Sequence, residues 1–326
     1  MREAGEQRWY RVHNALCPKG TGGVFLQLKQ RQPARRTGVW FVFLAAVLYS
    51  IGGLCIKVIP WSGLAINGGR NLIALLVIGG YLCFTKHRPR FNRWILLGAF
   101  AICGTNTFFT MANKMTTAAN AIVLQFTAPI FVILLSALFW RKRPALLDIA
   151  ACAAVLLGVA CFFVESLEGG ELVGNLLALV SGLSYAGVFL LNDLPDSDPI
   201  SSVFWGDVMS AMIGLPFLLQ ERDFGLVPMT SLIVLGAFQV GVAYILLTIG
   251  LRTTPPVTAS LVSGIEPVLN PILVAVFYQE TIGPLSLVGA IIVVGSVIGY
   301  NVIKGRRTVA AAHTTDEKER LEHDYL

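Results

Sequence analysis

The chain has 326 residues, of which 55% are hydrophobic and only 13% are charged. Soluble globular domains carry about 25% charged residues, so this balance excludes that class and indicates that lipid is the solvent. The formal net charge of +6 does not predict nucleic-acid binding, because the basic residues stand at the ends of apolar segments and form no basic stripe.

Ten segments have the length and apolarity of a membrane-spanning helix, which needs about 20 residues to cross the hydrocarbon core. In chain order they are residues 39–58, 62–84, 94–113, 117–139, 146–164, 172–191, 200–219, 230–250, 256–278 and 284–303. Segments of this length exclude the shorter strands of a closed barrel. We therefore predict an all-α integral membrane protein with ten transmembrane helices in the cytoplasmic (inner) membrane.

Lysine and arginine residues mark one side of the membrane. They gather at alternate segment ends, for example in residues 86–93, 141–143 and 304–307, whereas the opposite ends carry few. By the positive-inside rule, both termini are cytoplasmic. The basic N-terminal tail also lacks the long apolar stretch of a cleaved signal peptide.

The two halves of the chain are copies of one unit. Residues 97–142 return in the same register as residues 235–280, so that Thr116 matches Thr254 and Pro129 matches Pro267. Five helices per copy is an odd number, so the second copy enters the membrane from the opposite face and the repeat is inverted. Inverted repeats of this kind support alternating access around a central site.

This repeat divides the chain into four parts. Residues 1–37 form a basic cytosolic tail, residues 38–165 the first repeat with helices 1–5, and residues 172–304 the second repeat with helices 6–10. Residues 305–326 form a cytosolic C-terminal tail.

Cysteine and histidine residues predict no metal, cofactor or catalytic site. The six cysteines are scattered without CxxC spacing, and all four histidines lie outside the apolar segments. Neither a disulfide framework nor a zinc site follows from this arrangement. An integral-membrane enzyme is disfavoured for the same reason, since no nucleophile–base or metal constellation is present.

Several features together carry a family resemblance. They are the duplicated five-helix unit, Arg70 inside the second segment, Pro129 and Pro267 midway along segments 4 and 9, and Glu280 closing segment 9. In these features the chain resembles ten-helix members of the drug/metabolite transporter superfamily with two EamA-type repeats. One position departs from the pattern, because Lys142 stands in the first repeat where Glu280 stands in the second.

The resemblance implies a function. It implies a secondary transporter, in the form of an exporter, that carries small metabolites across the cytoplasmic membrane. Amino-acid-like or other amphipathic compounds are the expected small-molecule substrates. A regulatory or receptor protein that keeps this fold without flux is the alternative.

Glu266 and Arg70 are the strongest charged candidates for a substrate site, because an ionisable group near the bilayer midplane is costly unless a partner or a wet cavity receives it. Glu266 precedes Pro267 in segment 9, where a kinked or broken helix is expected. The carboxylate either recognises a cationic substrate group or couples to protons, or it is a structural residue bonded to a neighbouring helix. Arg70 either holds a substrate carboxylate or forms a fixed ion pair with Asp207 or Glu266.

Polar and aromatic residues from several other segments complete the predicted substrate-binding set. Each of them forms either the lining of a central cavity or an interhelical hydrogen bond. They are Tyr49, Asn106, Asn120, Gln125, Tyr185, Gln239, Tyr244 and Asn270.

Gly295 and Gly299 form a G-x-x-x-G motif in segment 10. Such a motif permits close helix packing. It either forms a homodimer contact or packs against residues 146–164 of the same chain.

Overall fold

The computed structural model describes residues 37–140, 145–169, 171–191, 196–254, 262–279, 283–296, 298–300, 302–303 and 306. The predicted tails, residues 1–37 and 305–326, lie outside the described residues except for Thr37 and Arg306. The positions of Lys142 and Glu280 also lie outside them.

All regular secondary structure in the described ranges is helical. Six helices there are long and apolar enough to cross a membrane, namely Thr37–Val58, Gly63–Phe84, Arg93–Met115, Ala118–Leu135, Pro199–Leu218 and Leu226–Leu251. Four shorter apolar helices accompany them, at Leu146–Cys161, Leu172–Val188, Glu266–Tyr278 and Pro284–Tyr300. The prediction of an all-helical membrane protein with ten apolar helices is confirmed.

Helices follow one another in this order along the described part of the chain: α3 (Gly52–Val58), α4 (Gly63–Phe84), α5 (Arg93–Met115), α6 (Ala118–Gln125), α7 (Ala128–Trp140), α8 (Leu146–Gly169), α9 (Leu172–Leu191), α10 (Pro199–Leu218), α11 (Leu226–Ile233), η1 (Val234–Val242), α12 (Ala243–Leu251) and α14 (Glu266–Tyr278).

Side-chain caps define where several helices begin. The hydroxyl of Ser62 accepts a hydrogen bond from the amide of Ala65 at the start of α4, and Oδ1 of Asn92 accepts from two amides at the start of α5. Thr117 caps α6 in the same way. Such caps satisfy amides that have no partner inside the helix, so the chain can turn sharply between neighbouring antiparallel helices.

Segment 4, residues 117–139, is interrupted in the structure. Helix α6 ends at Gln125 and α7 begins at Ala128, with a turn at Phe126 and Thr127 between them. Pro129 has no amide hydrogen and therefore removes a hydrogen bond from this turn. The matching Pro267 lies in the first turn of α14, which follows a turn at residues 264–265.

The helix between Leu226 and Leu251 contains a π-helical stretch, η1, over Val234–Val242. The matching part of the first repeat lies within the uninterrupted α-helix α5. A π-helical stretch carries more residues per turn than an α-helix and is frequent at functional sites. The two repeats thus differ in backbone geometry at one position along the membrane.

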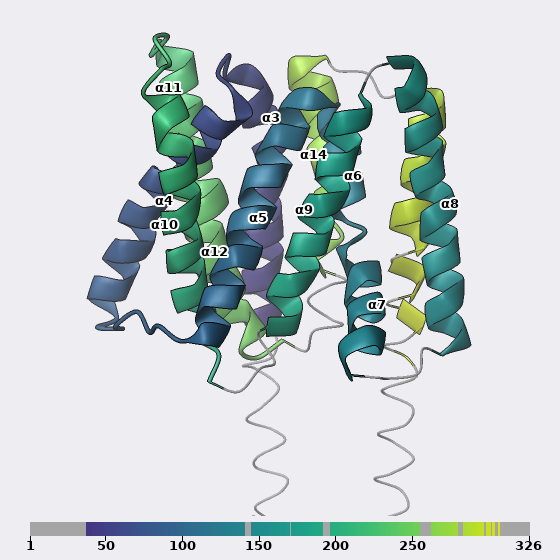
Figure 1. The fold of residues 1–326 in the computed structure, drawn as a ribbon, viewed down its shortest axis with the longest axis horizontal. Helices are drawn as coiled ribbons and strands as arrows, with labels where there is room; N and C mark the ends of the chain where they lie inside the picture. Colours follow the sequence, from purple (N-terminus) through teal and green to yellow (C-terminus); the bar gives the residue numbers. More distant parts are fainter. Residues whose placement is uncertain are drawn as a thin grey trace, which may run out of the picture.

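The helices of the two repeats interlock. Helix α5 packs against α9 and α10, and α4 packs against α10 and η1. Helix α5 and the matching helix α11–η1–α12 run in opposite directions (Figure 1), as an inverted repeat requires. Where α4 crosses α10, a Cβ on Gly214 would collide with the backbone of Gly68, so the two backbones touch.

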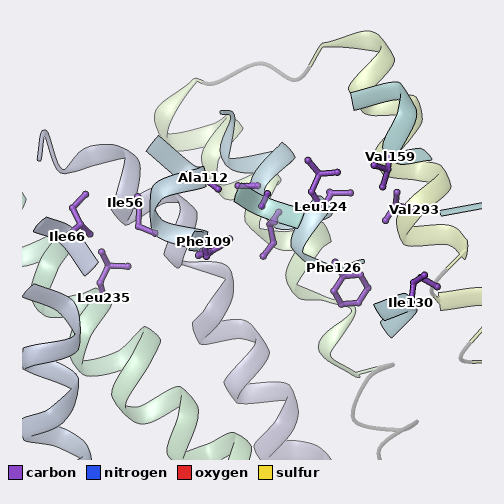
Figure 2. Packing of buried hydrophobic residues seen from close by; sticks show 14 of the residues in the cluster. Ile56, Ile66, Phe109, Ala112, Leu124, Phe126, Ile130, Val159, Leu235 and Val293 are labelled. Carbon is purple, nitrogen blue, oxygen red and sulfur yellow. The ribbon is translucent and has the colours of Figure 1, made fainter. Parts of the chain in front are cut away.

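One apolar core joins the two repeats. It contains Ile56 and Ile66 from the first repeat and Leu235 from the second, all fully buried. Figure 2 shows these side chains beside one another, with Phe109 and Leu124 further along the same layer. The core therefore holds in place the helices that carry the buried polar residues.

The predicted packing of the G-x-x-x-G motif against segment 5 is wrong. A Cβ on Gly295 or Gly299 would meet nothing within 4 Å among the described residues. The close approach is made instead at Gly158 in α8, whose Cβ would lie 2.7 Å from Val293. The homodimer contact stays a prediction.

Candidate central binding site

A small cavity lies between the two repeats at the middle of the helices. Its volume is about 30 Å³, which is room for a few water molecules at most. The lining side chains come from both repeats: Tyr49, Arg70, Thr105, Asn106, Phe109, Gln125, Tyr185, Gln239, Tyr244 and Glu266. A metabolite would need these helices to move apart.

Most of the predicted substrate-binding residues meet at this cavity. The predicted residues on its wall are Tyr49, Arg70, Asn106, Gln125, Tyr185, Gln239, Tyr244 and Glu266. Thr105 and Phe109 also line it and were not predicted. Their signal is positional, because Thr105 is adjacent to Asn106 and Phe109 lies about one helical turn further on.

Asn120 and Asn270 do not line the cavity. Asn120 lies at the start of α6 near the end of the bundle, where its amide nitrogen is 3.3 Å from Thr116 Oγ1 and from Glu171 Oε2. Asn270 lies one turn beyond Glu266, where its side chain is fully buried against Gly53. The depth of each residue in its helix does not determine which way its side chain faces.

Arg70 is almost completely buried and its guanidinium has three polar partners. Nη1 donates to Gln239 Oε1 at 3.3 Å, and Nη2 donates to the backbone oxygen of Asn106 at 2.9 Å and to Asn67 Oδ1 at 3.5 Å. Nε has no partner among the described residues. The guanidinium is therefore held in place by three different helical segments, with one donor left over.

Asn106 connects the two buried charges Arg70 and Asp207. Its amide nitrogen donates to Asp207 Oδ1 at 3.2 Å, while its backbone oxygen accepts from Arg70. Asp207 is fully buried, and its second oxygen has no hydrogen-bond partner in the described residues. The expected direct ion pair between Arg70 and Asp207 is absent from the described residues, and Asn106 bridges the two side chains instead.

Tyr244 joins the same network from the second repeat. Its hydroxyl donates to Asn106 Oδ1 over 3.4 Å. Its ring also meets the ring of Tyr49 edge to face, with centroids 5.5 Å apart. This arrangement is a favourable geometry for aromatic pairs.

Gln125 and Glu266 face the cavity from the two interrupted segments. Gln125 donates through Nε2 to Ser181 at 2.6 Å, so its amide is tied to α9. Glu266 is half-buried and has no hydrogen bond or ion pair to another described residue. Its carboxylate is thus the least engaged charged group on the wall.

The helices around the cavity approach each other closely at matching places near the two ends of the bundle. A Cβ on Gly174 would lie 2.6 Å from the backbone of Met115 near one end. A Cβ on Gly38 would lie 2.7 Å from Thr254 Oγ1 near the other end. Thr116 and Thr254 are repeat equivalents, so the same pair of elements makes each contact.

Polar bonds reinforce both ends. At the first end, the hydroxyl of Thr116 lies 2.9 Å from Glu171 Oε2 and 2.7 Å from Asn175 Oδ1. At the other end, His87 Nε2 lies 2.7 Å from Asp198 Oδ2. The bundle is thus tied together above and below the cavity.

A second small pocket, of about 20 Å³, lies on the far side of Tyr185 and Tyr244 and extends to Pro199 and Leu251 at the helix ends. The two tyrosines therefore separate it from the central cavity. Among the described residues, no three His, Cys, Asp or Glu side chains gather closely enough to hold a metal ion.

The sequence matches the EamA-like transporter family twice, over residues 36–164 and again over residues 172–302. The chain belongs to the EamA-like transporter family. It is a multi-pass membrane transporter with a small-molecule substrate, and it is not an enzyme.

Two relatives and one solved structure are similar to this chain along most of their length. An uncharacterized transporter of Archaeoglobus fulgidus is 25% identical over 266 residues, covering 81% of this chain and 96% of the relative. An uncharacterized transporter of Clostridium kluyveri is 23% identical over 319 residues, covering 87% of this chain and 99% of the relative. A protein crystal structure with 18% identity and a TM-score of 0.59 covers 84% of this chain and 99% of its own, and it supports the fold.

Proposed function

We propose that this protein exports small amphipathic metabolites, amino-acid-like or similar, by alternating access. The observation that carries the proposal is the central cavity, where polar and aromatic side chains from both inverted repeats meet between two close helix contacts at opposite ends of the bundle. Sites at the interface of inverted repeats are where secondary transporters bind their substrates. Polar groups within an apolar, aromatic wall suit an amphipathic compound.

The matched contacts at Gly174 and Gly38 support alternating access. The contact of Gly174 with Met115 and the contact of Gly38 with Thr254 involve the same elements of the two repeats, placed at opposite ends. Opening one contact while the other stays closed would expose the cavity to one side at a time. The two repeats would then exchange these arrangements in each transport cycle.

Protons are the coupling ion in this proposal, and Glu266 is where they act. The carboxylate lines the cavity and has no partner among the described residues. A proton and a cationic substrate group would compete for it, so an inward proton gradient would drive the substrate outward. This exchange agrees with export.

The proposed orientation places both termini in the cytoplasm, by the positive-inside rule. The end of the bundle that contains His87 and Arg90, in the loop between α4 and α5, would face the cytoplasm. The end that contains Thr116 and Glu171 would face outward. A receptor that keeps the fold without flux is the alternative.

The test is flux of labelled compounds through proteoliposomes. A suitable panel is L-phenylalanine, L-alanine, phenyltrimethylammonium and benzenesulfonate, which carry fixed or zwitterionic charge and cross lipid poorly unaided. We expect flux of at least one compound above that of protein-free liposomes. Tyr185→Ala should lower this flux, whereas Tyr278→Ala, at a side chain that is 45% exposed, should not. Folded protein without flux of any panel compound would favour the receptor alternative.

A further inference from the structure

In the described part of the chain, one basic side chain faces two acidic side chains around the central cavity. The charged side chains that line it or contact its wall, among the described residues, are Arg70, Asp207 and Glu266. Arg70 and Asp207 are linked through Asn106 and act on each other electrostatically. Arg70 therefore already has a buried counter-charge, and one carboxylate is left over.

The remaining carboxyl group is that of Glu266. Among the described residues, no arginine, lysine or histidine forms an ion pair with it. It faces the cavity directly, whereas Asp207 lies behind Asn106 and is fully buried. A ligand entering the cavity would meet this charge before it could meet Asp207.

Three tyrosines line the same cavity as this carboxylate. They are Tyr49, Tyr185 and Tyr244. Tyr49 and Tyr244 already stand edge to face, 5.5 Å between ring centroids. Phe109 adds a fourth ring to the wall.

Aromatic rings around an anion are the arrangement that recognises ammonium groups. The face of an aromatic ring attracts a cation within about 6 Å, and the attraction grows when water is excluded. A carboxylate among the rings adds a direct charge partner. A carboxylate-bearing ligand gains less here, because Nη1 and Nη2 of Arg70 already donate to Gln239, Asn67 and Asn106 and only Nε is left over.

We infer that the substrate class is organic amines and ammonium compounds with an apolar body, held by Glu266 within the cage of Tyr49, Tyr185 and Tyr244. A carboxylate on the substrate is dispensable. This inference rests on the proposed transport function and specifies the chemistry of the same cavity.

The test compares three probes of similar size on the full-length protein in detergent. Binding of labelled phenyltrimethylammonium is competed with unlabelled phenyltrimethylammonium, L-phenylalanine and benzenesulfonate, which are a cation, a zwitterion and an anion. We expect the cation to bind at least about tenfold more tightly than the anion, with the zwitterion between them. Glu266→Gln should remove this preference, and Glu266→Asp should keep it.

Asp207→Asn provides an independent test of the same assignment, because it removes the acidic partner of Arg70. We expect it to strengthen benzenesulfonate binding relative to the wild type. Ser210→Ala is the matched control, since Ser210 lies about one turn further along α10 and does not line the cavity. It should leave the order of the three probes unchanged.

The outcomes separate the two proposals. Benzenesulfonate binding as tightly as the cation, or a cation preference that survives in folded Glu266→Gln protein, would overturn the assignment of amines. If the wild type transports benzenesulfonate but not phenyltrimethylammonium, the transport proposal stands and the amine assignment falls. If folded protein neither binds nor transports any of the probes, both fall.

Discussion

The hydroxyl of Tyr244 lies 3.4 Å from Oδ1 of Asn106, and these two residues occupy the same position in the two repeats. Equivalent residues can touch only where the pseudo-two-fold axis of the repeat passes between them. The central cavity, which both residues line, therefore lies on that axis. A site on the axis can keep its contacts while the two halves exchange conformations.

Asn106 should be more important for stability than Tyr244. Asn106→Leu would remove the amide that donates to Asp207 at 3.2 Å and leave a fully buried carboxylate without a described partner. We expect a loss of about 1–3 kcal/mol or more, measured as a lower melting temperature in detergent. Tyr244→Phe removes only the long hydrogen bond to Asn106 and should shift the melting temperature little. Equal shifts for the two variants would contradict the bridging role of Asn106.

Gly214 should tolerate no side chain. A Cβ there would strike the backbone of Gly68, which cannot move aside as a flexible side chain can. We expect Gly214→Ala to destabilise the protein by about 1–3 kcal/mol, as overpacking does. Gly79→Ala on α4 is the control, because its Cβ would meet nothing within 4 Å. A Gly214→Ala protein as stable as the Gly79→Ala protein would show that α4 and α10 do not cross this closely.

Substitutions at Gly174 and at Gly38 should open the bundle at opposite ends. Gly174→Val would push against the backbone of Met115, and Gly38→Val would push against Thr253 and Thr254. In the proposed orientation, the Thr116 end faces outward and the His87 end faces the cytoplasm. We therefore expect Gly174→Val to hold the outer end open and Gly38→Val to hold the cytoplasmic end open.

Phe109→Cys in a cysteine-free background reports these openings, because Phe109 lines the central cavity. An impermeant maleimide added from outside should label it faster in Gly174→Val, and one added to inverted vesicles should label it faster in Gly38→Val. Gly80→Val, with nothing within 4 Å of its Cβ, should change neither rate. Faster labelling from the same side in both variants would contradict the pair of gates.

The polar bonds at the outer end should slow its opening. Thr116→Val removes the hydroxyl, which donates its one proton to Glu171 or Asn175 and accepts from Asn120, while keeping the side-chain shape. Each such bond contributes about 0.5–1.5 kcal/mol. We therefore expect faster labelling at position 109 from outside, with a smaller effect than that of Gly174→Val. An unchanged rate would mean that these bonds play no part in closing the outer end.

The sequence predicted which residues meet at the centre better than it predicted how each helix is shaped. The internal repeat pairs residues of equal depth, such as Asn106 with Tyr244, and residues of equal depth in an inverted repeat meet near the axis. Depth alone does not give the rotation of a helix about its own axis, and for this reason Asn120 and Asn270 face elsewhere.

Backbone irregularities were predicted unevenly. A proline in the sequence predicts an interrupted helix. The interruption before α14 was therefore expected from Pro267, and the interruption between α6 and α7 follows from its equivalent Pro129 by the same reasoning. The π-helical stretch η1 contains no proline, and its two glycines, one glutamine and otherwise apolar residues do not predict a wider helical turn. It packs against α4, and the sequence does not specify that contact.

Proton-driven efflux from wild-type and Glu266→Gln proteoliposomes decides whether Glu266 couples transport to protons. The vesicles are preloaded with the panel compound that the wild type transports fastest, and efflux is followed with the outside at the same pH or acidified. We predict that acidification speeds wild-type efflux and that folded Glu266→Gln protein loses this response. A Glu266→Gln protein that responds to acidification as the wild type does would contradict the role of Glu266 as the coupling residue.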